Sequence, residues 1–334
     1  MKAATARAHP NIALVKYWGK RDETLMLPAA GSLSMTLDAY PTTTEVTPAS
    51  GSDDEFVFDG ELVDPHHPSA QKVTQFLDVV RQLADRQLAG EPGAHKPLPR
   101  ARVSSHNEAP TAAGLASSAA GFAALAVAAA AAYGLDADTA QLSRLARRGS
   151  GSACRSVIDR FAIWHRGEDD ASSFAEATPA PEMRMVVCAI NAAPKAVSSR
   201  EGMRLTQRTS PFYDAWAHST EALLRQAVAA CRAGDFTRLG ELTEVHAFRM
   251  HALTQSSEPP LRYLAPASWA AFDRVAELRA AGIETYATAD AGPNVVAIAR
   301  PADAAAVAEA LSEFGETRVV APGAGAQLLP GKLD

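Results

Sequence analysis

An almost uncharged run of small side chains from Ala109 to Leu135 constrains the fold more than any other feature of the chain. Most of the run is alanine, which favours a helix but partitions only weakly into hydrocarbon. Its length would allow a membrane span, but Pro110, Gly114, Gly121 and several hydroxyl side chains interrupt the apolar surface. We therefore expect a soluble protein with a close-packed helix buried in its interior.

The length of 334 residues exceeds what one hydrophobic core usually serves and predicts two domains with a cleft between them. The polar segment from Gly167 to Glu182 is the best boundary, so we expect an N-terminal domain at 1–182 and a C-terminal domain at 183–334. A net charge of −6 argues against a nucleic-acid-binding surface. It does not exclude phosphorylated metabolites, which a few converging cations can bind.

The cysteines Cys154, Cys188 and Cys231 are too few and too scattered for a disulfide framework or a zinc site. They fit a reducing compartment, and the N-terminus lacks the continuous apolar segment of an export signal. We therefore expect a cytoplasmic protein with free thiols.

Hydrophobic periodicity predicts a mixed succession of strands and helices. We expect three early strands, at 12–15, 32–37 and 56–58, to form one antiparallel sheet. Helices are expected at 69–88, 138–148, 214–233, 236–254 and 267–281, and an alanine-rich helix is expected to follow a loop through Pro110 and to end near 133–134. Further strands are expected at 102–105, 183–190, near 285 and near 295, followed by a last helix–strand unit. This order predicts an α+β second half.

The segment from Pro110 to Ser118 places tiny side chains between an expected strand and the alanine-rich helix. The free N–H groups and the dipole of a helix N-terminus can hold a phosphate there. From the spacing alone, the segment is equally consistent with an ordinary N-terminal turn of a tightly packed helix. No Walker lysine is present.

Two further segments concentrate cations. Lys16 and Lys20 follow a short strand beside two aromatic residues, where they could meet an anion or flank a core strand as exposed lysines. Arg147, Arg148 and Arg155 surround a Gly-Ser-Gly-Ser turn that suits phosphate or carboxylate recognition. Arg147 and Arg148 can also be explained as basic residues at a helix C-terminus, where they complement the helix dipole. This alternative explains Arg155 less readily.

Three other polar residues are ordinary when taken alone. Asp290 precedes a Gly-Pro turn, where an aspartate commonly bonds its own backbone. His246 and His251 lie five positions apart on an expected helix, which is a poor spacing for a metal pair. We expect ordinary surface or core histidines.

In order along the chain, five motifs resemble those of diphosphomevalonate decarboxylases of the GHMP kinase superfamily. They are Asn-Ile-Ala-Leu-Val-Lys-Tyr-Trp-Gly-Lys at 11–20, Pro-Thr-Ala-Ala-Gly-Leu-Ala-Ser-Ser at 110–118, Ser-Gly-Ser-Ala-Cys-Arg at 150–155, Val-Ser-Ser-Arg-Glu-Gly-Met at 197–203 and Asp-Ala-Gly-Pro-Asn at 290–294. The resemblance covers nearly the whole chain. It implies a two-domain α/β (α+β) fold of the GHMP kinase type, with an N-terminal domain like domain 2 of ribosomal protein S5, a ferredoxin-like C-terminal domain and the active-site cleft between them.

The resemblance also implies the reaction. ATP, with Mg²⁺, would phosphorylate the tertiary C3 hydroxyl of mevalonate 5-diphosphate, after which phosphate and carbon dioxide depart and isopentenyl diphosphate remains. This is a step of the mevalonate pathway of isoprenoid biosynthesis. A homodimer is the usual expectation for such a protein, with no nucleic-acid or membrane partner.

Position by position, the resemblance assigns roles to named residues. Asp290 would orient or deprotonate the C3 hydroxyl, Arg155 would hold the substrate carboxylate, and Lys16 would neutralise developing phosphate charge, with Ser199 as a further catalytic residue. The expected substrate-binding residues are Tyr17, Trp18, Gly19, Lys20, Lys72, Ser150, Gly151, Ser152, Ala153, Cys154, Arg155, Ser199 and Arg200. The expected ATP-binding residues are Pro110, Ala113, Gly114, Leu115, Ala116, Ser117 and Ser118, with Ser117 or Ser118 meeting the metal through Mg²⁺-ATP.

Two departures from the family pattern bear on substrate choice. Ala30-Gly31-Ser32 stands where relatives usually have Asn-Ser-Ser, and Asp159-Arg160 stands where they often have Gly-Gly. A phosphomevalonate or bisphosphomevalonate decarboxylase is therefore an alternative, as is a mevalonate 3-kinase that stops at phosphorylation. The alternative from another class is a protein that binds metabolite and nucleotide without turnover.

Overall fold

The computed structural model describes residues 1–88, 98–108, 117–190 and 197–330 of the chain. The strands in residues 1–182 are β1 (Ala4–Ala8), β2 (Asn11–Val15), β3 (Lys20–Asp22), β4 (Leu27–Pro28), β5 (Ser32–Thr36), β6 (Thr42–Pro48), β7 (Glu55–Phe58), β8 (Glu61–Leu62), β9 (Ala101–Asn107), β10 (Phe161–Trp164) and β11 (Ala175–Ala177). The helices in this half are α1 (Pro68–Leu88), α2 (Ser117–Tyr133), α3 (Thr139–Gly149) and α4 (Ala153–Ser156).

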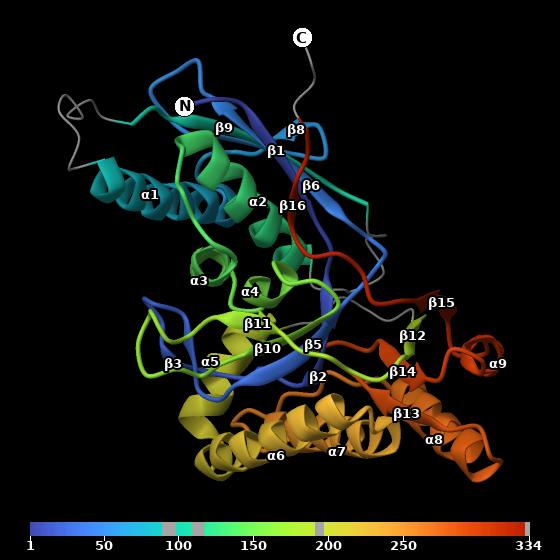
Figure 1. Ribbon diagram of the computed structural model, residues 1–334. Helices are drawn as coiled ribbons and strands as arrows, with labels where there is room; N and C mark the ends of the chain where they lie inside the picture. The colour runs from blue at the N-terminus through green and yellow to red at the C-terminus, as the bar shows by residue number, and fades with distance from the viewer. Residues whose placement is uncertain (89–97, 109–116, 191–196, 331–334) are drawn as a thin grey trace.

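The second half is built from longer helices and a smaller sheet. Its helices are α5 (Ser199–Thr209), α6 (Tyr213–Ala233), α7 (Phe236–Gln255), α8 (Pro266–Ala280) and α9 (Ala304–Leu311). Its strands are β12 (Arg184–Ala189), β13 (Thr285–Thr288), β14 (Val295–Ala299), β15 (Glu316–Val320) and β16 (Gln327–Leu328). Figure 1 shows α1 and α2 at one end of the molecule and α6, α7 and α8 at the other, with β2, β5 and β10 between them.

Helix α2 lies in the interior of the first half, as its composition predicts. Ala123, Ala124 and Ala126 have 0% of their surface exposed, although they point in different directions around the helix, where each residue is turned by about 100° from the one before. The helix packs on β1 and β6 on one side and on α3 and α4 on another, so small side chains are needed all round. In the described parts of the chain, no helix is both long and apolar enough to cross a bilayer.

The early strands do not form one antiparallel sheet, so that prediction is wrong. A six-stranded sheet has the order β16-β1-β6-β9-β7-β8, and β7 runs parallel to β9 within it. A separate four-stranded sheet has the order β11-β10-β5-β2. The periodicity of a strand identifies its buried face but not its partner, and here β5 and β7 each pair with a strand far along the chain.

The two halves share apolar core. Leu14 and Leu33 on the second sheet belong to the same buried cluster as Leu223 on α6 and Leu239 on α7. The third sheet, of order β13-β14-β12-β15, adds Met185 to this cluster. At its C-terminal end the chain returns to the first half, where β16 pairs with β1. The domain boundary near residue 182 stays a prediction.

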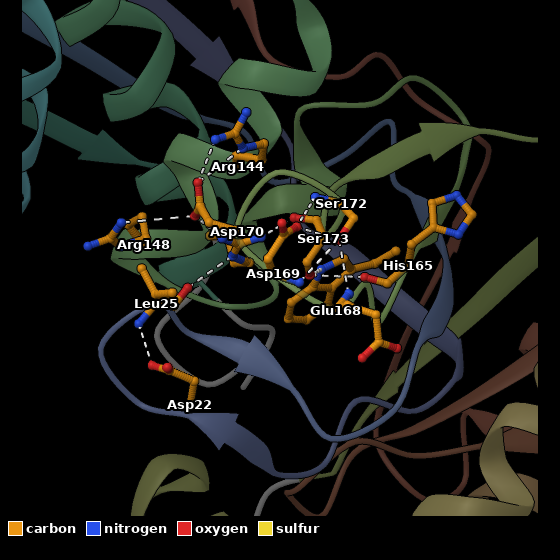
Figure 2. A network of polar contacts seen from close by, with 12 residues as sticks. Asp22, Leu25, Arg144, Arg148, His165, Glu168, Asp169, Asp170, Ser172 and Ser173 are labelled. Carbon is orange, nitrogen blue, oxygen red and sulfur yellow. Dashed lines mark hydrogen bonds and ion pairs between the residues drawn. The ribbon is translucent and has the colours of Figure 1, made fainter. Parts of the chain in front are cut away.

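The polar segment at 167–182 is packed against the first half. Its Asp170 contacts the guanidinium groups of Arg144, Arg147 and Arg148, and Figure 2 shows this network from close by. Arg147 is fully buried and donates from Nε to the carbonyl of Leu25, 3.1 Å away. Because Leu25 lies in the turn between β3 and β4, the network fixes the hairpin that begins at Lys20.

We predict that Asp170→Asn lowers the free energy of unfolding by about 2–4 kcal/mol, because it leaves the buried Arg147 guanidinium without its counter-charge. Urea unfolding followed by circular dichroism measures the change. Asp169→Asn is the matched control, because the Asp169 carboxylate accepts from the exposed Ser172 instead. Equal losses in the two variants would contradict the prediction.

Candidate functional site

A cavity of about 210 Å³ lies where the two halves meet, and all five sequence motifs contribute to its wall. The predicted residues that line it are Lys16, Tyr17, Trp18, Lys20, Lys72, Ser118, Ser150, Gly151, Ser152, Arg155, Ser199, Arg200 and Asp290. Segments almost 280 positions apart in the sequence are thus brought to one place. The alternatives in which each motif is an isolated turn or helix end do not account for this convergence.

Three predicted substrate residues lie behind the wall. Gly19 has a φ of 108° and a Cβ there would lie 1.8 Å from the Tyr213 hydroxyl oxygen, so only glycine fits between the hairpin and α6. Ala153 and Cys154 are fully buried in α4, which carries Arg155 into the site. Outside the described residues lie Pro110, Ala113, Gly114, Leu115 and Ala116, together with the side chain of Ser117.

Lys16 and Asp290 form an ion pair across the two halves. Lys16 follows β2, and its Nζ donates to the Asp290 carboxylate and to the Ala13 carbonyl, each 2.8 Å away. The Lys16 side chain is 1% exposed, whereas that of Asp290 is 50% exposed at the cavity wall. Burial lowers the pKa of Lys16, and the Asp290 charge opposes that shift. The exposed-lysine alternative is therefore wrong for Lys16.

Arg155 is a buried cation whose described hydrogen bonds all go to uncharged oxygens. Its Nε donates to Asn11 at 3.2 Å and to Ser34 at 3.0 Å, and its Nη1 donates to Ser32. Burial lowers the pKa of this guanidinium, although nearby charges that include Asp290 oppose the shift. A guanidinium held this way at a cavity wall suits a carboxylate or phosphate ligand, which would supply the missing counter-charge.

Further cations gather at the same wall. Lys20 is buried, and its Nζ donates to Glu23 at 3.0 Å. Glu23 also accepts two hydrogen bonds from Arg204 on α5, and this contact above all lowers the Glu23 pKa to about 2. Burial, followed by the charges of Arg200 and Lys20, lowers the pKa of Lys72 to about 8. An incoming anion would relieve that repulsion.

Hydroxyl groups complete this part of the wall. The Tyr17 hydroxyl is buried and has no hydrogen-bond partner among the described residues. It lies against Gly151, where a Cβ would be 2.6 Å from the hydroxyl oxygen, so glycine allows the close approach. Burial raises the pKa of Tyr17, which keeps the proton available for donation. Ser118 and Ser150 lie beside it with their hydroxyl oxygens 3.4 Å apart.

The charge of the cavity favours anions over metal ions. Asp290 is the one carboxylate among its described lining residues, which include the cations Lys16, Lys20, Lys72, Arg155 and Arg200. No group of three or more His, Cys, Asp or Glu side chains in the described ranges could hold a metal ion. Magnesium would therefore be held mainly by phosphate oxygens, and the Ser118 hydroxyl is a fitting oxygen ligand beside them.

Two histidines on α7, expected to be ordinary surface or core residues, are core residues that contact the backbone beside the site. His246 is fully buried and accepts the backbone N–H of Lys16 at Nδ1, 2.9 Å away. His251 is also buried and has its Nε2 3.4 Å from the carbonyl of Ala289. Burial lowers their pKa values to about 3 and about 4. Their i, i+5 spacing in the sequence gave no sign of contact with the backbone beside the site.

None of the residues in the two departures from the family pattern lines the cavity, although Ser32 accepts a hydrogen bond from Arg155, which does. Asp159 accepts the backbone N–H of Gly325, and Arg160 has a φ of 56° in the turn before β10. Ala30 and Gly31 are buried beside α6, and neither is among the lining residues. Any influence of these four positions on substrate choice would therefore be indirect, and it stays a prediction.

The chain matches known families along most of its length. Residues 8–175 match the diphosphomevalonate decarboxylase-like N-terminal domain, and residues 185–322 match the mevalonate 5-diphosphate decarboxylase C-terminal domain. The chain is similar to diphosphomevalonate decarboxylase of Homo sapiens, with 39% identity over 313 residues that cover 89% of this chain and 76% of the relative. The corresponding protein of Ganoderma lucidum is 37% identical over 323 residues, which cover 88% and 77%.

Solved structures share the fold. MDDEF in complex with MVAPP, AMPPCP and magnesium superposes with a TM-score of 0.90 at 44% identity, covering 98% of this chain and 99% of that chain. Mevalonate diphosphate decarboxylase from Staphylococcus aureus superposes with a TM-score of 0.90 at 38% identity, covering 98% of both chains. The two-domain mixed α/β fold implied by the sequence resemblance is therefore confirmed.

The low pKa values of the two α7 histidines predict acid sensitivity. Unfolded histidine binds a proton near pH 6.5, whereas the folded protein keeps His246 and His251 neutral down to about pH 3 and about pH 4. The free energy of unfolding should therefore fall as pH drops below about 6.5, by up to about 1.4 kcal/mol per pH unit for each histidine. Urea unfolding at several pH values between 7 and 5 measures this slope.

A matched pair of variants separates this effect from general acid denaturation. In His251→Asn the free energy of unfolding should depend less steeply on pH. The substitution removes a group that binds a proton in the unfolded state but not in the folded state. Gln207→Asn, at an exposed position on α5, should leave this pH dependence unchanged, because it removes no proton-binding group. An unaltered slope in His251→Asn would contradict the assignment.

Proposed function

The chain belongs to the diphosphomevalonate decarboxylase family, and we propose that it converts mevalonate 5-diphosphate and ATP to isopentenyl diphosphate, ADP, phosphate and carbon dioxide. One observation carries the proposal: the Lys16–Asp290 pair and the uncompensated Arg155 guanidinium line the same cavity. A carboxylate that can take a proton and a cation that can hold a second carboxylate are the two groups this reaction requires.

Asp290 acts on the substrate hydroxyl in the first step. Its side chain is half exposed at the cavity wall and takes the proton of the C3 hydroxyl as the oxygen attacks the γ-phosphorus of ATP. The bond from that phosphorus to the ADP oxygen breaks, and ADP leaves. Lys16, held 2.8 Å from Asp290, offsets negative charge that develops beside it.

Arg155 sets the direction of the second step. Phosphate leaves C3 with the electron pair of the C–O bond, and positive charge builds on that carbon. The bond between C2 and the carboxylate carbon then breaks, and its electrons form the C2–C3 double bond as carbon dioxide departs. Asn11 and Ser34 hold the Arg155 guanidinium in place, so a carboxylate bound to it is oriented before the bond breaks.

The cation-rich wall supports a diphosphate as the substrate's other end. Tyr17, Lys20 and Lys72 would contact it together with the turn at Ser150 and Gly151. We assign Ser199 and Arg200, at the start of α5, to the same substrate. A monophosphate would leave more of this positive charge uncompensated, so the charge balance favours the diphosphate over the phosphomevalonate alternative.

A second cavity supports the assignment of ATP. It has a volume of about 150 Å³, borders Ser118 and is walled by Phe56, Phe122 and Leu125. Flat, largely apolar space beside a helix N-terminus suits a nucleotide base whose phosphates reach the first cavity. Magnesium, when bound with ATP, neutralises phosphate charge, and the Ser118 hydroxyl is the described group placed to contact it.

We further propose a homodimer in the cytoplasm, divided into domains near residue 182. The three cysteines are free and buried, which fits a reducing compartment. Phe248 and Trp269 are partly exposed and stack with ring centroids 6.1 Å apart on α7 and α8, which offers apolar surface for a second copy. Light scattering of the purified protein tests the dimer, and a monomer at working concentration would exclude it.

We predict that purified protein with ATP and magnesium releases carbon dioxide and ADP in equal amounts from mevalonate 5-diphosphate. Mevalonate, its 5-phosphate and its 3,5-bisphosphate should react more slowly, because they lack either the diphosphate or a free C3 hydroxyl. Coupled ADP and carbon dioxide assays on all four compounds measure this. Faster turnover of the 5-phosphate, or ADP release without carbon dioxide, would overturn the proposal.

We also predict that Asp290→Asn lowers kcat at least about 100-fold with little rise in KM, because the amide cannot take a proton. The change also removes the charge that counters the lowering of the Lys16 pKa by burial. Asp273→Asn, on the exposed face of α8, is the matched control and should keep full activity. A folded Asp290→Asn variant that keeps more than about a tenth of the activity would exclude Asp290 as the base.

A further inference from the structure

Lys16 is held through its backbone as well as through its ammonium group. The β2–β5 ladder shifts register between Ala13 and Val15, directly before Lys16. The Lys16 N–H donates to Nδ1 of His246, 2.9 Å away on α7. A side chain from the second half therefore fixes the backbone at the point where the chain leaves strand β2.

The hydrogen bonds around His246 specify one neutral tautomer. Nδ1 accepts from Lys16, so it carries no proton. At the other ring nitrogen, Nε2 lies 3.0 Å from the hydroxyl oxygen of Thr220. That hydroxyl already donates its proton to the carbonyl of Trp216, 2.8 Å away, so it can only accept from Nε2. The proton of the imidazole is therefore on Nε2.

Helix α7 contacts the backbone at Lys16 and directly before Asp290. His246 holds the Lys16 backbone, and His251 approaches the carbonyl of Ala289, the residue before Asp290. Both imidazoles are buried, and neither lines the cavity. Their contacts are thus with the backbone that carries the pair rather than with a bound molecule.

We propose that His246 is a positioning residue, whose unprotonated Nδ1 holds the Lys16 amide and so places the Lys16 ammonium beside Asp290. The inference rests on the proposed function, which makes that pair catalytic. The low pKa of His246 supports it, because an imidazole that stays neutral keeps the Nδ1 lone pair available throughout the working pH range. Protonation of Nδ1 would replace the hydrogen bond from the Lys16 N–H with a repulsive contact between two N–H groups.

The tautomer can be measured without any activity assay. In protein labelled with ¹⁵N-histidine, the His246 side chain should show Nδ1 as an unprotonated ring nitrogen and Nε2 as a protonated one at neutral pH. His246→Asn identifies the resonances by their loss. A proton on Nδ1 would overturn the proposal, because that nitrogen could not accept from Lys16.

Two substitutions then test the consequence for catalysis. Asn places an amide oxygen near the position of Nδ1 and can accept the same N–H, whereas Leu leaves that buried donor unpaired. His246→Leu should lower kcat at least about tenfold with KM changed less than about threefold, and His246→Asn should restore most of the loss. A thermal melt of both variants establishes that they are folded.

The outcomes separate this inference from the proposed function. Equal kcat in folded His246→Leu and the wild type would overturn the positioning role, as would equal damage by Leu and Asn. If His246→Leu fails to fold, the tautomer measurement and His246→Asn decide. A wild-type protein that does not decarboxylate mevalonate 5-diphosphate would overturn the proposed function, whatever the tautomer proves to be.

Discussion

A lysine ammonium buried at the junction of the two halves is the constraint on which the arrangement depends. The Lys16 side chain is 1% exposed, and an unpaired ammonium at such depth would lose its hydration without compensation. Asp290 supplies the counter-charge from the β13–β14 connection, and it can do so only when the second half is docked. The shared apolar cluster around Leu14 and Leu239 provides the docking energy, so core packing and charge pairing stabilise the same arrangement.

Arg155 presents the opposite case, a buried charge that forms no hydrogen bond with a carboxylate in the described part of the chain. Asn11, Ser32 and Ser34 satisfy its N–H groups but bring no negative charge. Removing such a charge from water is costly, and nothing in the described hydrogen bonding offsets it fully. A site that accepts this cost gains affinity for an anion of matching shape, which is the trade between stability and function that binding sites commonly show.

The sequence could predict the features that depend on residues close together in the chain. The helices α1, α3, α6, α7 and α8 were predictable because their periodicity and caps lie within a few residues, as in the Asp138–Gln141 capping box of α3. Helix α5 was missed, although Ser198 and Glu201 form the same motif. Sheet membership was not predictable, because β7 pairs with β9 across α1. The burial of Lys16 and the contact from His246 depend on tertiary packing, which no local pattern of residues encodes.

The excess of positive charge in the cavity explains why substrate and site should stabilise one another. Burial above all, followed by the charges of Arg200 and Lys20, lowers the pKa of Lys72 to about 8, so part of the Lys72 population is uncharged near neutral to mildly basic pH. Each phosphate charge that enters offsets this repulsion and favours the charged lysine, so binding and protonation of Lys72 are linked. Glu23 already offsets part of the Lys20 charge through a 3.0 Å contact, so most of the remaining positive charge that a ligand can offset lies on Lys72, Arg200 and Arg155. An anion with a diphosphate at one end and a carboxylate at the other matches those positions in charge, and an anion with fewer charges would leave part of the repulsion in place.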